Sequence, residues 1–439
     1  MKNNVLFLAL TIVTAWLATG CAVQRGHVER ELTTVLNADL DKAIVGVSIY
    51  HEQQQRFLAE QNAYLKMTPA SVTKLLAAYA VLKYMPDSLP GWYVHETADT
   101  LYIRPNSDGT FLNPAFKEQR FYDKLAATNK PIVLNIPRAL ANFEPLGQGN
   151  GYRSARERSF MPIYGNVVRF RRAGNKLRTI PSYFERYVPI DLQVEPEKKY
   201  RVNRNQHDNY FKVTPAKTAT TQCAFTMHKD EHLAYHLLQD TLKGKTIVLN
   251  TESLALPYQP FYTHKTDAVL ELMLHTSSNF LAEQFLLMVS DKVLDNQISD
   301  LLTMKKVMAD NFAEFYDQPV WVEGSGLSRG NAISPRFFIS LLQKMKQEFS
   351  EDRLRKVLPQ GNEGTLKGYY LGNEKHIYAK TGTLLSSTAG GGVVALCGYV
   401  DTKKGNSVLF SFIVNNHQGT ATSVRRSIER VITNIINHY

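Results

Sequence analysis

The sequence has few of the residues that build disulfide frameworks or other cross-linked scaffolds. It contains three cysteines in 439 residues, and apart from Cys21 near the N-terminus only Cys223 and Cys397 remain. Two cysteines do not make a disulfide framework, and their spacing does not decide whether they pair. The sequence also lacks a low-complexity tract, a clear repeat and a nucleic-acid motif. These absences exclude a small disulfide-stapled domain and a nucleic-acid-binding module.

Metal-binding patterns are equally sparse. His228, His232 and His236 are four residues apart and would share one helix face, a spacing compatible with zinc. However, Glu231 lies directly before His232, so the H-E-x-x-H pattern is missing. We therefore interpret these histidines as a polar helix face and expect neither a metal nor a cofactor.

Acidic residues are fewer than basic residues. The chain has 51 Lys and Arg against 40 Asp and Glu, which gives a net charge of +11. This excess indicates either a solvated basic surface or attraction to anionic wall polymer or lipid headgroups. With 44% hydrophobic and 21% charged residues, the composition is that of a globular protein, and the length suggests two or three domains.

The long apolar run lies at the N-terminus. It extends from Val5 to Leu17 after a short charged segment, and it has the length of a signal-peptide core. Small residues then precede Cys21, as in a bacterial lipoprotein cleavage box, although Ala18 stands where that box has leucine. We predict that residues 1–21 are a lipoprotein signal peptide, that Cys21 becomes the lipidated N-terminus, and that Ala22 favours the outer membrane. Simple secretion to the periplasm is the alternative.

Three short polar motifs occur once each and in a fixed order. They are Ser71-Val72-Thr73-Lys74, Ser277-Ser278-Asn279 and Lys380-Thr381-Gly382. Each motif is weak alone, because a Ser and a Lys one helical turn apart usually form a solvated face and Ser-x-Asn mostly marks a helix cap. Together they supply a nucleophile, two amines, a second hydroxyl and a carboxamide. This trio is known from penicillin-recognising serine enzymes.

The neighbouring residues place the catalytic groups on predicted elements. Ser71 follows a proline and precedes the apolar run 75–82, which predicts a buried helix with Lys74 one turn after Ser71. We assign Ser71 as the nucleophile and neutral Lys74 as its base. The pKa of Lys74 must then be depressed by desolvation or by a second cation, for which Lys380 is the candidate. Ser277 would relay a proton to the leaving amine, and Asn279 would hold the substrate amide.

The third motif is predicted to bind the substrate. It ends an extended run, and Thr381 and Thr383 are candidates to bind a terminal carboxylate beside Lys380. Gly382 beside a strand would allow close approach by a ligand. The backbone N–H groups of Ser71 and Thr383 would form the oxyanion hole.

At these residues the chain resembles the class C low-molecular-mass penicillin-binding proteins, the D-Ala-D-Ala carboxypeptidase/endopeptidase family. The resemblance includes residues 68–74, and residues 323–331 are similar to the DGSGLSRxN element of that family, with Glu323 in place of its Asp. The separation of 206 positions between Ser71 and Ser277 fits the large insert of the family. The resemblance implies cleavage of peptidoglycan stem peptides, inhibition by β-lactams, and a role for Arg329 at the acidic group of the third stem residue. The insert shows no clear match to the acidic partner that the family supplies there.

The pattern of elements predicts an α+β fold of the penicillin-binding-protein/β-lactamase type. Strands at 43–50, 377–380, 393–400 and 407–414, with a C-terminal helix at 421–436, indicate one antiparallel sheet built from both chain ends and flanked by helices. We predict a discontinuous domain at 22–90 and 236–439, and a β-rich insert of two small subdomains at 91–235. Helices are expected at 28–40, 71–84, 231–241, 264–276, 279–293, 298–315 and 335–348.

Other interpretations stay open. Residues 326–330 match G-x-S-x-G, the nucleophile elbow of α/β-hydrolases, and Asp401 and His417 follow in the required order. The simpler interpretation is that Ser328 lies in a turn that supports the site, because the next helix is expected only at Pro335. A wall-binding lipoprotein that keeps the fold without the chemistry is a second alternative, and a β-lactamase is a third, although no glutamate motif for deacylation is present.

Overall fold

The computed structural model describes residues 28–35, 38, 40–144, 156–205, 208–227, 232–295, 297–385 and 391–439. The predicted signal peptide, Cys21 and His228 lie outside these residues. Among the described residues, the structure has no helix long and apolar enough to cross a membrane.

The central sheet is built from both ends of the chain. Its five strands are antiparallel in the order β13-β14-β15-β1-β2. The strands are β1 (Ile44–His51), β2 (Arg56–Gln61), β13 (Ile377–Leu384), β14 (Gly392–Asp401) and β15 (Ser407–His417). The predicted antiparallel sheet is therefore confirmed, and it leaves β13, which carries the third motif, at an edge.

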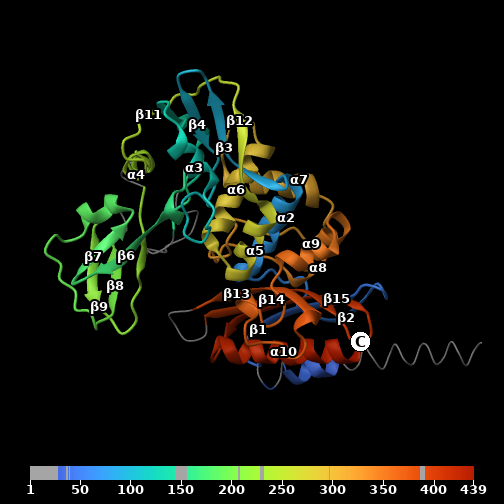
Figure 1. Ribbon diagram of the computed structural model, residues 1–439. Coiled ribbons are helices and arrows are strands. Elements are labelled where there is room, and N and C mark those ends of the chain that lie inside the picture. Colours follow the sequence, from blue (N-terminus) through green and yellow to red (C-terminus); the bar gives the residue numbers. More distant parts are fainter. Residues whose placement is uncertain are drawn as a thin grey trace, which may run out of the picture.

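Each face of this sheet buries a separate apolar core. Successive side chains of a strand point to opposite faces of the sheet. In β14, Ala395 and Cys397 therefore face one core, and Val394 and Leu396 face the other. α10 (Ala421–His438) and the helical residues 28–35 cover the second face, and the helices within residues 74–84 and 266–357 lie over the first (Figure 1). The mixed α+β fold predicted from the sequence is confirmed.

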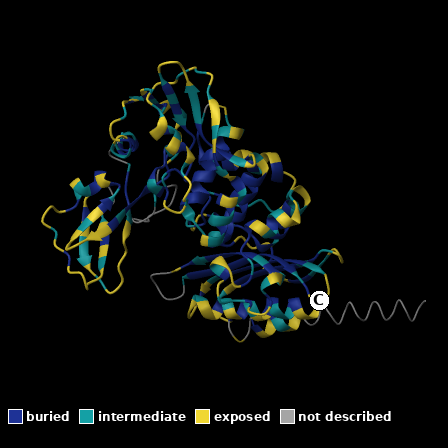
Figure 2. Cartoon of the chain, viewed as in Figure 1, coloured by how far each residue is buried: buried dark blue, intermediate teal, exposed yellow. Residues whose placement is uncertain are grey.

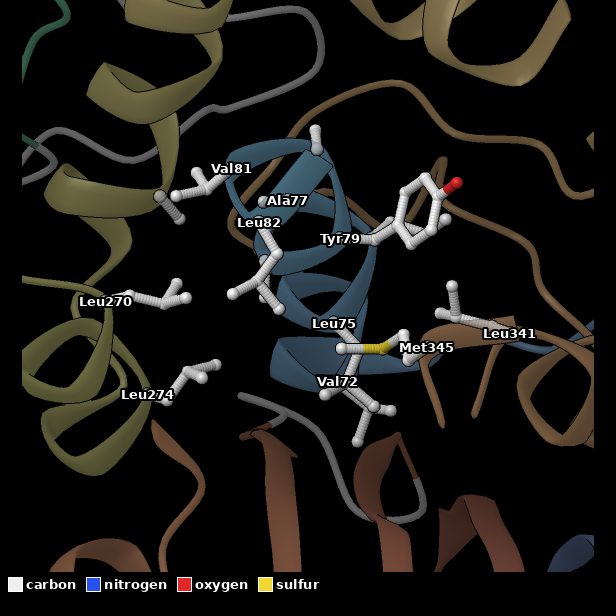
Figure 3. Close-up of a cluster of buried hydrophobic side chains, with 14 of the residues drawn as sticks. Val72, Leu75, Ala77, Tyr79, Val81, Leu82, Leu270, Leu274, Leu341 and Met345 are labelled. Carbon is white, nitrogen blue, oxygen red and sulfur yellow. The ribbon is translucent and has the colours of Figure 1, made fainter. Parts of the chain in front are cut away.

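The helix that follows the nucleophile forms the centre of the helical layer. α2 (Lys74–Tyr84) buries every residue from Lys74 to Leu82, as expected for a helix that is apolar all round. It packs between α5 (Thr266–Thr276), which contributes Leu270 and Leu274, and α8 (Pro335–Glu348), which contributes Leu341 and Met345 (Figure 3). Figure 2 shows this layer and the sheet below it as the most buried part of the molecule.

The insert forms a separate group of smaller sheets with its own core (Figure 1). A five-stranded sheet has the order β11-β5-β4-β3-β12, with parallel pairs β4–β5 and β5–β11, and smaller sheets of order β10-β6-β7 and β8-β9 lie beyond it. The strands are β3 (Ser88–Glu96), β4 (Leu101–Pro105), β5 (Ile132–Asn135), β6 (Val167–Ala173), β7 (Lys176–Ile180), β8 (Tyr200–Arg204), β9 (Phe211–Pro215), β10 (Gln222–Ala224), β11 (Ile247–Asn250) and β12 (Gln259–Lys265).

The first sheet of the insert continues past residue 235, where the sequence analysis ends the insert. β11 and β12 pair with β5 and β3, and residues 237–247 contribute to the apolar core of the insert. Local patterns do not encode this pairing, because the partners are more than 100 residues apart in the chain. Cys223 of β10 and Cys397 of β14 are free thiols.

The other helices divide between two cores: the first two along the chain pack in the insert, and the last three pack around α2. They are α3 (Arg120–Ala127), α4 (Leu233–Thr241), α6 (Asn279–Val293), α7 (Asp300–Phe312) and α9 (Glu351–Val357), with short 3-10 turns η1 (Ala70–Thr73), η2 (Arg138–Leu140), η3 (Tyr164–Asn166), η4 (Ser182–Tyr187), η5 (Gly364–Leu366) and η6 (Glu374–His376). Serine N-caps begin three of the long helices: Ser278, Ser299 and Ser334 each accept a hydrogen bond from a backbone N–H in the first turn.

Candidate active site

The structure brings the three polar motifs together between the sheet and the helical layer. Lys74 Nζ donates to Ser71 Oγ at 3.0 Å and to Asn279 Oδ1 at 2.6 Å. Lys380 Nζ donates to Ser277 Oγ at 2.9 Å. The site therefore holds two amine–hydroxyl pairs, one for the nucleophile and one for the second serine. All five residues predicted to be catalytic are members of one of these pairs or bind directly to one.

Close backbone packing positions Ser71. The residue before it, Ala70, has a φ of +51°, a region that L-residues rarely adopt. Two glycines make room for this turn: a Cβ on Gly382 would lie 2.7 Å from Pro69 O, and a Cβ on Gly326 would overlap Ala70 O. Gly382 therefore allows close approach of the nucleophile segment to β13, whereas the sequence analysis predicted close approach of a ligand.

The second motif is a helix–helix junction, as predicted. Ser277 is the C-cap of α5 in the left-handed region, with a φ of +53°, and Ser278 is the N-cap of α6. The junction directs Ser277 Oγ to Lys380, and Asn279, the first residue of α6, reaches Lys74. A two-residue turn thus delivers one group to each of the two lysines.

Burial of the amine lowers the pKa of Lys74 to about 8, and the carboxyls of Glu323 and Glu283 oppose this effect. Burial, followed by the charge of Lys74, lowers the pKa of Lys380 well below its usual value. The lowered pKa of Lys74 was expected to come from desolvation or from a second cation, and desolvation is the cause that the structure supports. A base with a pKa near neutrality is suited to accept a proton from a serine.

Glu323 holds the loop behind Lys74, and the sequence analysis assigned it no role. Its buried carboxylate accepts hydrogen bonds from the backbone of Ser325 at 3.1 Å and of Gly326 at 2.6 Å, and from Asn331 Nδ2 at 2.5 Å. The carbonyl of Ser325 in turn accepts a bond from Lys74 Nζ. Although burial opposes ionisation, hydrogen bonds from Glu283 and Ser325 keep the pKa of Glu323 below its usual value.

A second buried carboxyl connects this loop to the insert. Glu283 of α6 accepts a bond from Ser325 N at 2.7 Å, and burial and the charge of Glu323 raise the pKa of Glu283 well above its usual value. Arg158 of the insert donates to Glu283 at 3.2 Å and pairs with Asp300 of α7. Sequence spacing gives no signal for this network, since Arg158 and Glu283 are separated by 125 positions.

The two threonines of the third motif lie on the face of β13 opposite to Lys380. Residues directly opposite in an antiparallel pair share a face, and Thr381 and Thr383 are opposite Leu396 and Val394, whose side chains contact the α10 core. Thr383 Oγ1 accepts a bond from Nη2 of Arg425 in α10 at 2.6 Å. The sequence analysis did not find Arg425, because a contact between a strand and a distant helix leaves no local pattern.

Arg329 lies near the same edge of the sheet. Its guanidinium donates to the carbonyl of Gly391, directly before β14, at 2.9 Å. The interpretation of residues 326–330 as a hydrolase elbow is wrong, because no helix begins between residues 313 and 334, all of which the structure describes. Ser328 is buried, and its Oγ accepts a bond from Gly330 N at 3.1 Å, as expected for a supporting turn.

Comparisons with known proteins identify relatives. A model described as the D-Ala-D-Ala carboxypeptidase 3 (S13) family matches residues 182–436. Penicillin-sensitive carboxypeptidase A of Dictyostelium discoideum is 28% identical over 116 residues, which cover 25% of this chain and 22% of that protein. D-alanyl-D-alanine carboxypeptidase DacB of Haemophilus influenzae is 24% identical over 249 residues, covering 53% of this chain and 48% of that protein. These alignments span about half or less of the length of the curated relatives.

Solved structures share the fold. Penicillin binding protein 4 of Haemophilus influenzae superposes with a TM-score of 0.69 at 17% identity, covering 92% of this chain and 99% of that one. The same protein has also been solved in complex with a β-lactam. The predicted penicillin-binding-protein type of fold is confirmed.

Proposed function

The chain belongs to the D-Ala-D-Ala carboxypeptidase 3 (S13) family, and on that premise we propose that it is a serine-type D-Ala-D-Ala carboxypeptidase or D,D-endopeptidase. Its substrates are peptidoglycan stem peptides, and it works through an acyl-enzyme on Ser71. The observation that carries the proposal is the pair of amine–hydroxyl contacts, Lys74 with Ser71 and Lys380 with Ser277. A nucleophile and a proton relay, each beside its own buried amine, are what acyl transfer without histidine requires.

The geometry around Lys74 explains how Ser71 is activated. Three acceptors surround Nζ: Ser71 Oγ, Asn279 Oδ1 and Ser325 O. In the neutral amine, two N–H bonds satisfy Asn279 and Ser325, and the lone pair is left facing Ser71 Oγ. Ser71 can then attack a carbonyl carbon while its proton passes to Lys74.

The remaining groups complete the reaction. The new bond joins Ser71 Oγ to the acyl carbon, and the backbone N–H groups of Ser71 and Thr383 stabilise the oxyanion. The peptide C–N bond then breaks, and Ser277 passes its proton to the leaving amine and takes in return the proton that Lys74 received from Ser71. Lys380 orients this hydroxyl, and hydrolysis of the acyl-enzyme by water regenerates Ser71. Arg329 is proposed to bind the acidic group of the third stem residue.

The experiment is digestion of purified muropeptides. We expect the protein to release D-Ala from monomeric pentapeptides, to convert cross-linked dimers to monomers, or to do both, and Ser71→Ala to do neither. Release of D-Ala without loss of dimers identifies a carboxypeptidase, and conversion of dimers identifies an endopeptidase. If neither substrate changes and no β-lactam adduct forms, the proposal fails and a non-catalytic wall-binding protein of the same fold takes its place.

We also propose where the protein works. The envelope substrate and the predicted signal peptide favour the periplasm, with Cys21 lipidated and anchored in the outer membrane. β-Lactams are expected to acylate Ser71 as covalent inhibitors. Labelling of cells with a radioactive fatty acid tests the anchor: the wild-type chain should incorporate label and Cys21→Ala should not.

A further inference from the structure

A permanent cation reaches the third motif from the C-terminal helix. Arg425 of α10 donates from Nη2 to Thr383 Oγ1 at 2.6 Å. Thr383 is half-buried at the edge strand β13, so a ligand that lies along this edge can contact side chains of both faces. A ligand bound along this edge at Thr383 would therefore lie next to Arg425, although α10 covers the opposite face of the sheet from the nucleophile.

The guanidinium of Arg425 has no countercharge among the described residues. Within the described residues, no carboxylate lies at ion-pair distance from Arg425, whereas the adjacent Arg426 pairs with Glu429 at 2.5 Å. The Nε of Arg425 is buried and makes no hydrogen bond. A buried donor without an acceptor is unfavourable, and an ionised acceptor that occupies this edge would remove the deficit. The arrangement is suited to bind an anion.

The other cation near this edge is already engaged. Lys380 Nζ donates to Ser277 Oγ and to the carbonyl of Thr381, and burial and the charge of Lys74 lower the pKa of Lys380. Because Lys380 donates to these acceptors and lies on the face of β13 opposite to Thr383, it is poorly suited to serve as a fixed positive charge for the substrate. A guanidinium stays charged at all physiological pH values.

A small cavity lies beside Arg425. It has a volume of about 20 Å³ and is lined mostly by apolar and aromatic side chains, among which Thr381, Thr365 and Arg425 supply polar groups. Thr365 Oγ1, like Arg425 Nε, is buried and has no hydrogen-bond partner in the part of the chain that the structure describes. Two orphaned polar atoms at one cavity are a second sign that an acceptor belongs at this edge.

We propose that Arg425 is a specificity-determining residue, which supplies the positive charge that binds the C-terminal carboxylate of the stem peptide together with Thr383. This inference rests on the proposed function. The C-terminal helix α10, which lies outside the three motifs, thereby selects substrates that have a free carboxylate next to the scissile bond.

The test compares two tripeptides that end in D-Ala-D-Ala, one with a free C-terminal carboxylate and one with a C-terminal primary amide. We expect Arg425→Met to lower kcat/KM for the carboxylate peptide about 10- to 100-fold, as for loss of a hydrogen bond to a charged group, and to leave the amide peptide almost unchanged. Arg425→Lys should restore part of the preference. Arg430→Met, at an exposed position of the same helix, is the matched control and should change neither rate.

Two outcomes separate this inference from the proposed function. If the wild-type protein cleaves neither peptide and forms no β-lactam adduct, the proposed function fails; if it forms the adduct but does not cleave the carboxylate peptide, the inference about Arg425 is overturned. If the wild-type protein is active and Arg425→Met lowers both rates equally or neither, only the inference about Arg425 is overturned. Circular dichroism establishes that each variant is folded. If Arg425→Met is not folded, the inference is tested on Arg425→Lys by the ratio of its kcat/KM for the carboxylate peptide to its kcat/KM for the amide peptide.

Discussion

Replacement of Arg158 by methionine should destabilise the contact between the insert and the helical layer. Arg158 pairs with Asp300 and donates to Glu283, and its side chain is only 3% exposed, against 9% for Asp300. Two of its nitrogens also donate to the carbonyl of Glu144. Methionine keeps most of the volume and the apolar stem, so the change removes mainly the charge and the hydrogen bonds.

The expected cost follows from burial. Removing one partner of a buried ion pair leaves an uncompensated charge, and we expect a loss of about 3–5 kcal/mol of unfolding free energy. The matched control is Arg178→Met, which breaks the pair of Arg178 with Glu185 in the same insert. Those side chains are 58% and 37% exposed, so we expect that change to cost less than about 1 kcal/mol.

Urea unfolding followed by intrinsic fluorescence measures the difference as a shift of the transition midpoint. Adding Asp300→Asn to Arg158→Met should recover part of the loss, because the double variant no longer buries an unpaired carboxylate. If Arg158→Met shifts the midpoint no more than Arg178→Met does, the ion pair does not join the insert to the helical layer and the reasoning is refuted.

Three further predictions concern the catalytic groups. Acylation by a labelled β-lactam should accelerate about tenfold per pH unit and level off above about 8, because Lys74 acts as the neutral amine and its pKa is about 8; a flat profile between pH 5 and 8 would contradict this role. Gly326→Ala should cost at least about 2 kcal/mol and slow acylation, since its Cβ overlaps Ala70 O, whereas Gly244→Ala, which has a similar φ and open space, should cost only the backbone strain; equal costs in thermal unfolding would refute the packing argument. Ser277→Ala should slow peptide cleavage about 10²- to 10⁴-fold, and unchanged turnover would remove Ser277 from the proton path.

Much of the architecture could be predicted because it is encoded locally. The apolar run after Ser71 and the Ser-Pro pair at 334–335 set the starts of α2 and α8, and α6 spans the predicted residues 279–293. The extended runs at 393–400 and 407–414 identified β14 and β15, of which β15 pairs with β1. In each case neighbouring residues carry the signal, whether as an apolar period, a cap or a proline.

The rest depends on contacts between segments far apart in the chain. The pairing of β11 and β12 with the strands of the insert, and the parallel pairs within that sheet, have no signature in a single segment. The same holds for the side chains that surround the motifs. Arg425 and Arg158 each meet their partners across long separations, so only the fold reveals that they belong to the site or to its support.

The central claim is that Ser71 is the nucleophile of a site built by the three motifs. Mass spectrometry of the protein after incubation with a penicillin, followed by peptide mapping, tests it most directly. The account predicts one covalent adduct, located on the peptide that contains Ser71 and absent from Ser71→Ala. An adduct that persists in Ser71→Ala or maps to another residue would contradict the account.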